Sequence, residues 1–242
     1  MKVHEDLPRQ GPGSAETTLR ALNALPQIKP QAHIYDMGCG PGHAALILAR
    51  TLQTKIIAVD LEQPFLDQLQ INASAEGLSH LIETRHHDML ALSEPAESID
   101  LIWAEGSIYC AGFDKALQSW WPILAKDGLV ACTELSWLND KRSQEAQDFW
   151  HLNYPQARSI DQNIAGAVAS GYMLLGHFIL PETAWWDEYY NPILTNIERL
   201  TPEAAEDQYL AAAISEAQTE IDLYRHHSAD YGYVFYLLKK SA

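Results

Sequence analysis

Three glycines at alternating positions are the strongest chemical feature of this chain. Residues 32–35 predict a buried strand, the sequence continues as DMGCGPGH from position 36, and helix-forming residues begin at Ala44. Glycine adopts turns that other residues avoid, and the first N–H groups of a helix have no intrahelical partners. This segment can therefore bring bare backbone and free N–H donors against a polar ligand.

An acidic residue after the second apolar segment indicates what that ligand is. Residues 55–61 read KIIAVDL, and Asp60 lies 22 positions after Gly38. A carboxylate at about this distance holds the ribose hydroxyls in nucleotide-binding α/β sheets. The dinucleotide pattern G-x-G-x-x-G would need a glycine at position 43, where the chain has His43. The spacing thus favours a nucleotide site and counts against an NAD(P)-dependent oxidoreductase, which stays an alternative.

Other groups with chemical potential form no comparable pattern. His86, His87 and Asp88 are consecutive, but no further ligand stands at metal-binding spacing nearby, so we expect no metal site. The three cysteines are widely separated, which predicts reduced thiols in a cytoplasmic protein. Cys39 lies within the glycine turn without an adjacent base, and we interpret it as a small packing residue.

Composition limits the classes of partner. The chain has 242 residues, 47% of them hydrophobic, and a net charge of −16. Its length predicts one domain, or one domain with an embedded accessory lobe. The acidic balance disfavours a nucleic-acid substrate. No apolar run is long enough to span a membrane, and the N-terminal segment is not typical of a signal peptide.

Apolar segments and helical segments alternate over the first half. Ser14 predicts the N-cap of a first helix, and further helices are expected at 42–53, after Pro64 and at 114–125. The expected strands are residues 32–35, 55–61, 81–85, 99–104 and 129–134. This alternation predicts a doubly wound α/β sheet, which binds ligands at the carboxyl ends of its strands. The glycine turn, Asp60, Asp88 and Glu105 all follow such ends.

The second half is rich in aromatic residues. Residues 172–180 and 231–238 predict two strands, and the stretch from Thr183 to about His227 predicts helices that are acidic outside. These aromatic side chains could form a core, wall an acceptor pocket or make a homodimer face. The residues we consider for the pocket are Tyr109, Trp137, Trp185, Trp186 and Tyr189.

The segment D-x-G-x-G-x-G from Asp36 to Gly42 resembles motif I of the class I S-adenosylmethionine (SAM)-dependent methyltransferases. Longer strings resemble a group of bacterial UbiE-like small-molecule methyltransferases with no assigned substrate. These strings are QGPGS at 10–14, LIWAEGSIY at 101–109, TELSW at 133–137, HFILP at 177–181 and YGYVFY at 231–236. The resemblance covers residues 9–240.

The resemblance implies the Rossmann-like methyltransferase fold. In that fold a mostly parallel sheet of seven strands has the order 3-2-1-4-5-7-6, and the last strand is antiparallel. An N-terminal helix and a helical insertion before the last strand would complete it. The whole chain, 1–242, would be one domain, with a lid and helix at 1–30, a cofactor-binding half at 31–136 and a substrate-side half at 137–242.

The resemblance also implies the cofactor, SAM, and its product S-adenosyl-L-homocysteine. Asp60 would hold the ribose, Leu61, Asp88 and Met89 would lie against the adenine, and Glu105 with Gly106 would lie beside the sulfonium. SAM has no phosphate, and the glycine turn has no lysine or arginine. The residues expected to line the cofactor are Gly11, Asp36, Gly38, Cys39, Gly40, Gly42, Asp60, Leu61, Asp88, Met89, Glu105 and Gly106.

The predicted activity is methyl transfer to a small, apolar or aromatic metabolite. Alignment of the acceptor with the methyl group would supply much of the rate, and a base would help if the acceptor must lose a proton. The candidates for that base are His177, Glu134, Tyr109 and Glu105, with a packing histidine as the alternative for His177. A non-catalytic SAM-binding module also remains open.

Overall fold

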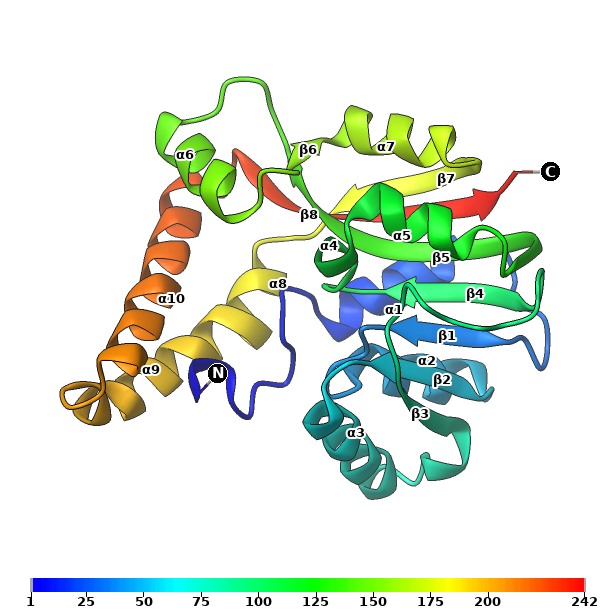
Figure 1. The fold of residues 1–242 in the computed structure, drawn as a ribbon, viewed down its shortest axis with the longest axis horizontal. Coiled ribbons are helices and arrows are strands. Elements are labelled where there is room, and N and C mark those ends of the chain that lie inside the picture. Colours follow the sequence, from blue (N-terminus) through cyan, green and yellow to red (C-terminus); the bar gives the residue numbers. More distant parts are fainter. Residues whose placement is uncertain (1, 242) are drawn as a thin grey trace.

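The computed structural model describes residues 2–241 and contains one sheet in the order β3-β2-β1-β4-β5-β8-β7 (Figure 1). β8 is antiparallel to both β5 and β7, and the other neighbours on this path are parallel. The strands predicted sixth and seventh, at 172–180 and 231–238, are β7 and β8. The predicted order and the antiparallel last strand are therefore confirmed. A short strand, β6, also pairs with the end of β5. The strands are β1 (Ile34–Met37), β2 (Ile56–Asp60), β3 (Ile82–His86), β4 (Ile99–Ala104), β5 (Leu124–Trp137), β6 (Arg158–Ser159), β7 (Tyr172–Ile179) and β8 (Tyr231–Lys240).

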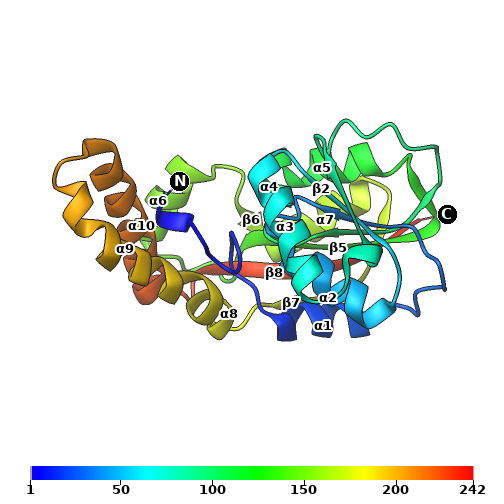
Figure 2. The same ribbon diagram turned by 90° about the horizontal axis from the view of Figure 1, so that it is seen from below.

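The helices cover both faces of the sheet and build a separate hairpin at one end (Figures 1 and 2). The α-helices are α1 (Ala15–Ala24), α2 (His43–Leu52), α3 (Gln63–Ala75), α4 (Ile108–Ala111), α5 (Phe113–Trp120), α6 (Gln144–Asn153), α7 (Ile160–Ala169), α8 (Thr183–Trp185), α9 (Asn191–Ala204) and α10 (Gln208–His227). Short turns of other helix types are η1 (Lys2–His4), η2 (Ser79–Leu81) and the π-helical η3 (Trp186–Tyr190).

Local sequence explains where the predicted helices begin and end. Ser14 caps α1 with a capping box, and Pro64 occupies the first turn of α3. Gly77, at φ +71°, follows the end of α3. The expected helix at 114–125 is wrong at its end, because α5 stops at Trp120, before Pro122. The sequence analysis also did not predict α6 and α7.

The sheet is buried on both faces, which explains the apolar sequence of β4 over 101–104, after Asp100 near its start. Leu101 and Trp103 belong to the cluster that includes α1, α2 and the helical insertion. Ile102 and Ala104 point the other way and pack with α5 and Tyr172. Because successive side chains of a strand alternate between faces, a strand covered on both sides needs apolar residues at every position.

The N-terminal segment links the helical insertion to the sheet. Asn196 of α9 donates from its side chain to the carbonyls of Val3 and Glu5 at 3.2 and 2.8 Å. Further along, the Gly13 N–H donates to the carbonyl of Ala184 at 2.9 Å. The segment before α1 therefore runs from α9 to the carboxyl edge of the sheet (Figure 2). Within residues 2–241, no helix combines the length and the apolar character needed to cross a membrane.

Candidate functional site

The glycine turn after β1 adopts a left-handed backbone that strongly favours glycine. Gly38, Gly40 and Gly42 have φ values of +69°, +52° and +93°. A Cβ atom at Gly42 would lie 2.0 Å from Leu69 Cδ1, and one at Gly38 would lie 2.4 Å from Ser107 Cβ. Gly38 and Gly42 are therefore favoured both by conformation and by close packing, and Gly40 by conformation.

Asp60 binds this turn directly. One of its carboxylate oxygens accepts from the Gly40 N–H at 2.8 Å, and the other accepts from the Glu62 N–H at 2.9 Å. The N–H groups of Gly38 and Cys39 both donate to the carbonyl of Val59, at 2.8 and 3.0 Å. The end of β2 thus fixes the glycine turn from its side. Burial raises the pKa of the Cys39 thiol well above its usual range, which agrees with a packing role.

The residues expected near an adenine lie at the ends of β2 and β3. Leu61 is 60% exposed, which is unusual for a large apolar side chain. The exposed Asp88 accepts from the Leu90 N–H at 2.8 Å, and the carbonyl of Met89 accepts from Trp120 Nε1 at 2.9 Å. The described residues contain no group of three His, Cys, Asp or Glu side chains that could hold a metal ion, so His86 and His87 form no such centre there.

A narrow cavity of about 50 Å³ lies between the glycine turn and the N-terminal segment. Asp36 lines it and is only 2% exposed, and its Oδ2 has no hydrogen-bond partner. Burial, followed by the charges of Glu105 and Asp60, raises the pKa of Asp36 to about 8. The other lining residues are Pro8, Arg9, Gln10, Gly11, Gly38, Cys39, Gly40, Pro41, His43, Ala44, Glu105 and Gly106.

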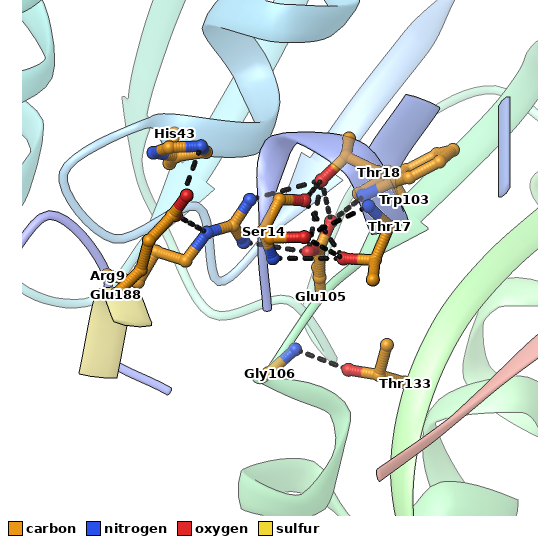
Figure 3. A network of polar contacts seen from close by, with 10 residues as sticks. All are labelled: Arg9, Ser14, Thr17, Thr18, His43, Trp103, Glu105, Gly106, Thr133 and Glu188. Carbon is orange, nitrogen blue, oxygen red and sulfur yellow. Dashed lines mark hydrogen bonds and ion pairs between the residues drawn. The ribbon is translucent and has the colours of Figure 1, made fainter. Parts of the chain in front are cut away.

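A buried ionic network surrounds Arg9 beside this cavity (Figure 3). Arg9 donates to Glu105 at 2.7 Å and to Glu188 of η3 at 3.0 Å. Glu105 also accepts from the Thr18 hydroxyl at 2.9 Å and from Trp103 Nε1 at 3.1 Å. Sequence reasoning missed Arg9, because its partners are 96 and 179 positions away along the chain.

His43 lies at the edge of the same network. Its Nε2 is 3.6 Å from Glu188, and burial lowers the pKa of its imidazole to about 3, so the ring is neutral at pH 7 (Figure 3). Nearby, the Gly106 N–H donates to the Thr133 hydroxyl at 2.7 Å, which ties the loop after β4 to β5.

Glu134 and Tyr109 lie on the other side of that loop. Glu134 is 2% exposed, and one of its oxygens accepts from the Tyr154 hydroxyl at 2.7 Å. Burial raises the pKa of Glu134 to about 8. The ring of Tyr109 meets that of Tyr154 edge to face at a centroid distance of 6.1 Å. The sequence analysis missed Tyr154, which comes from the segment after α6.

The remaining residues considered for the acceptor side divide between core and surface. Trp185 is 2% exposed and stacks on Tyr224 at 4.3 Å, and Trp137 is buried against Tyr231. Trp186 is partly buried beside Arg225. His177 is exposed on the edge strand β7. The alternative in which it is a buried packing histidine is therefore wrong.

Tyr189 lines a second cavity, of about 440 Å³, between η1, α6, η3, α9 and α10. Glu220 also lines it and accepts from the Tyr190 hydroxyl at 3.0 Å. Trp150 and Phe149 contribute aromatic walls. Sequence reasoning did not select Trp150 or Glu220, because nothing in the sequence indicates that α6 and α10 face each other.

Comparison with known proteins agrees with this architecture. Residues 34–128 match a family model described as "Methyltransferase domain". A ribosomal protein L11 methyltransferase from Alkaliphilus metalliredigens is 32% identical over 81 residues, which are 33% of this chain and 26% of that protein. A glycine/sarcosine/dimethylglycine N-methyltransferase from Actinopolyspora halophila is 29% identical over 122 residues, which are 50% of this chain and 22% of that protein. The matches thus span about a quarter of these curated relatives.

A solved structure extends the likeness to nearly the whole chain. The SAM-dependent methyltransferase from Geobacter sulfurreducens, in complex with S-adenosyl-L-homocysteine, has a TM-score of 0.84 at 16% identity, covering 98% of this chain and 96% of that one. At this identity the likeness shows the fold. Residues 34–128 thus resemble the methyltransferase domain family in sequence, and nearly the whole chain shares the fold of that SAM-dependent methyltransferase.

Proposed function

We propose that this protein transfers a methyl group from SAM to a small-molecule acceptor. The observation that carries the proposal is the buried, unpartnered oxygen of Asp36 in a cavity that Glu105 also lines, with Asp60 bound to the adjoining glycine turn. A buried carboxylate needs a donor or a cation. SAM carries a sulfonium and an ammonium group, whereas NAD(P) carries phosphates that these carboxylates would repel.

The chain's residues suit the parts of this cofactor. Asp60 offers its carboxylate to the ribose, Leu61 and Met89 offer apolar surface to the adenine, and Asp36 offers its free oxygen to the ammonium group. When bound, the sulfonium makes the methyl carbon a strong electrophile. The protein then needs to align an acceptor and exclude water.

Residues 8–13 act as a lid in this proposal. The present cavity of about 50 Å³ is much smaller than the roughly 300–1,000 Å³ of sites for drug-sized ligands. The segment must therefore shift outward before the cofactor enters. Arg9 holds it closed through Glu105 and Glu188, so closure would link the cofactor edge to the helical insertion.

We place the acceptor between Tyr109 and the helical insertion. The cavity of about 440 Å³ has the size of a small-molecule site, and Tyr189 and Trp150 give it aromatic walls. These walls favour an acceptor with an apolar or aromatic body.

Isothermal titration calorimetry tests the cofactor. We expect SAM and S-adenosyl-L-homocysteine to bind with micromolar affinity and NAD to show no binding. Asp60→Ala should weaken SAM binding by about 100-fold, because charge-assisted hydrogen bonds contribute roughly 1.5–3 kcal/mol each. Asp67→Ala, on the exposed side of α3, is the matched control. Binding of NAD but not SAM would overturn the proposal, and SAM binding without turnover on any acceptor would favour a non-catalytic module.

A further inference from the structure

We propose that the acceptor of this site carries an amino group, and that Glu134 binds this group as an ammonium ion and removes its proton. This inference rests on the proposed methyl transfer and names the chemical class of the acceptor. It depends on the contacts of Glu134, on its place beside the loop after β4, and on the charges around it.

Glu134 has a hydrogen-bonding oxygen that the protein leaves free. Its side chain lies on β5, opposite Val234 of β8, and is 2% exposed. Tyr154 occupies Oε1 at 2.7 Å, whereas Oε2 is buried without a partner. A buried acceptor without a donor is unfavourable, and more so if it is charged. A ligand with N–H donors would satisfy it.

The position of Glu134 suits a group that reacts with the cofactor. The neighbouring Thr133 accepts from the N–H of Gly106, which lines the cofactor cavity. Tyr109 follows three residues after Gly106, is 39% exposed and meets the ring of Tyr154. Tyr154 thus connects Glu134 to Tyr109, which lies in the same segment after β4 as Gly106 of the cofactor cavity.

The charges around Glu134 favour a cationic ligand. The one nearby guanidinium that acts on it, Arg158, is already bound by both oxygens of Asp114 at 2.8 Å. Glu220 adds a second, largely buried carboxylate on the side of the helical insertion. The charges of both carboxylates act on Tyr109 and Tyr233, and aromatic rings attract cations through their faces.

The pKa values of the tyrosines near Glu134 indicate how an acceptor that must lose a proton, such as a phenol, would ionise here. Burial first, then the neighbouring Cys110, and then the charges of Glu220 and Glu134 raise the pKa of Tyr109. Burial and Glu134 likewise raise the pKa of Tyr154. A phenolic acceptor here would therefore resist the ionisation that O-methylation requires. Burial has the opposite effect on an ammonium ion, because it favours the neutral, nucleophilic amine.

The reaction step balances without any further reactant. Glu134 accepts one proton from the bound ammonium ion and becomes a neutral carboxylic acid. The nitrogen lone pair then forms the N–C bond to the methyl carbon. The S–C bond breaks, and its electron pair stays on sulfur. The products are an N-methylated ammonium ion and neutral S-adenosyl-L-homocysteine. Burial raises the pKa of Glu134 to about 8, whereas the positive charge of the bound ammonium ion favours the carboxylate that this proton transfer requires.

Calorimetry with a pair of isosteric probes tests the inference. The full chain, saturated with S-adenosyl-L-homocysteine, is titrated with 2-phenylethylamine and with 2-phenylethanol. We expect the amine to bind about 10-fold more tightly or better, because only the amine forms a charge-assisted hydrogen bond with Glu134. Glu134→Gln should remove this preference, and Glu220→Gln should reduce it. Glu198→Gln, at an exposed position of α9, is the control and should preserve it.

A second variant separates binding from folding. Tyr154→Phe removes the internal donor but keeps the carboxylate, so the preference for the amine should persist. Equal binding of the two probes, or an unchanged preference in a folded Glu134→Gln variant, would overturn the inference. If S-adenosyl-L-homocysteine binds but the amine is not preferred, the amine inference fails and the proposed methyl transfer stands. If S-adenosyl-L-homocysteine itself does not bind, the proposed function fails.

Discussion

The proposed cofactor site at the ends of β1, β2 and β4, called the cofactor edge below, and the helical insertion, which comprises α8, η3, α9 and α10, form their cavities in different ways. At the cofactor edge, the ends of β1, β2 and β4 provide glycine backbone and carboxylates within short stretches of sequence. At the helical insertion, side chains from η1, α6, η3, α9 and α10 line one cavity. When a site is built from backbone and side chains at strand ends, its residues recur at a characteristic spacing in sequence. The residues of a site between packed helices have no such spacing.

The aromatic residues of the insertion illustrate this difference. Trp185 and Tyr190 are buried almost completely, and both have rings in contact with Tyr224. Tyr189 and Tyr190 both line the cavity, whereas Trp185 does not. Aromatic residues a few positions apart thus lie in the hydrophobic core or line the cavity. Aromatic content in the sequence therefore cannot distinguish core residues from cavity residues.

The largest loss of stability is expected for Trp185→Ala, which tests whether Trp185 is a core residue or a pocket residue. Loss of a buried aromatic side chain should lower the free energy of unfolding by about 3–5 kcal/mol. Tyr209→Ala, on the same insertion but 80% exposed, should change it by less than about 0.5 kcal/mol. Urea unfolding measures both. A small effect of Trp185→Ala together with lost acceptor binding would instead assign Trp185 to the pocket.

Substitution of Gly42, in the glycine turn, and of Gly77, after α3, separates the cost of a steric clash from the cost of a left-handed backbone. Gly42→Ala should lower the free energy of unfolding by about 2–4 kcal/mol, because the new Cβ would lie 2.0 Å from Leu69 Cδ1 at a φ of +93°. Gly77→Ala has a similar φ, +71°, but nothing within 4 Å of the new Cβ, so about 1 kcal/mol is expected. Thermal unfolding distinguishes them, and equal losses would show that conformation alone matters.

The ionisation of Asp36 should couple cofactor binding to pH. Burial raises its pKa from 3.8 to about 8, so the folded protein holds a proton that the unfolded chain has lost between these values. The free energy of unfolding should therefore fall as pH rises through this window. A cationic cofactor favours the ionised carboxylate, so SAM binding should release a proton and tighten by roughly 10-fold between pH 6 and 8.

Calorimetry in buffers of different ionisation enthalpy measures this proton release. Asp36→Asn cannot ionise and should show no release at this position. Proton uptake on SAM binding, or an affinity that falls with rising pH in the original protein, would contradict the role given to Asp36.

The smallest effect is expected at His177. Its side chain is exposed on the edge strand β7, next to Tyr236 at a ring distance of 6.4 Å. His177→Ala should change turnover by less than about 2-fold and the free energy of unfolding by less than about 0.5 kcal/mol. A loss of turnover near 100-fold would show that His177 acts in catalysis and would place the acceptor further toward β7.

Much of the fold could be predicted from sequence, because its elements are local. Alternating apolar segments, Ser14, Pro64 and Gly77 set the strands and helix ends before any long-range contact is known. The helix predicted to 125 is wrong because the apolar run near Trp120 and Trp121 outweighed the proline after it. α6 and α7 were missed although Ser143 and Ser159 cap their first turns.

By itself, the sequence determined which residues meet at the carboxyl edge of the sheet, where we propose that the cofactor binds. Backbone conformation requires glycine at particular positions, and parallel strands bring their carboxyl ends together, so Gly38, Asp60, Asp88 and Glu105 meet at one edge. Only the tertiary structure decided that Arg9 closes this edge, that Glu134 keeps one oxygen free, and that α6 and α10 enclose a cavity. Those features depend on contacts between residues far apart in sequence, where the partner of a charge or an aromatic ring is set by packing and leaves no spacing to recognise.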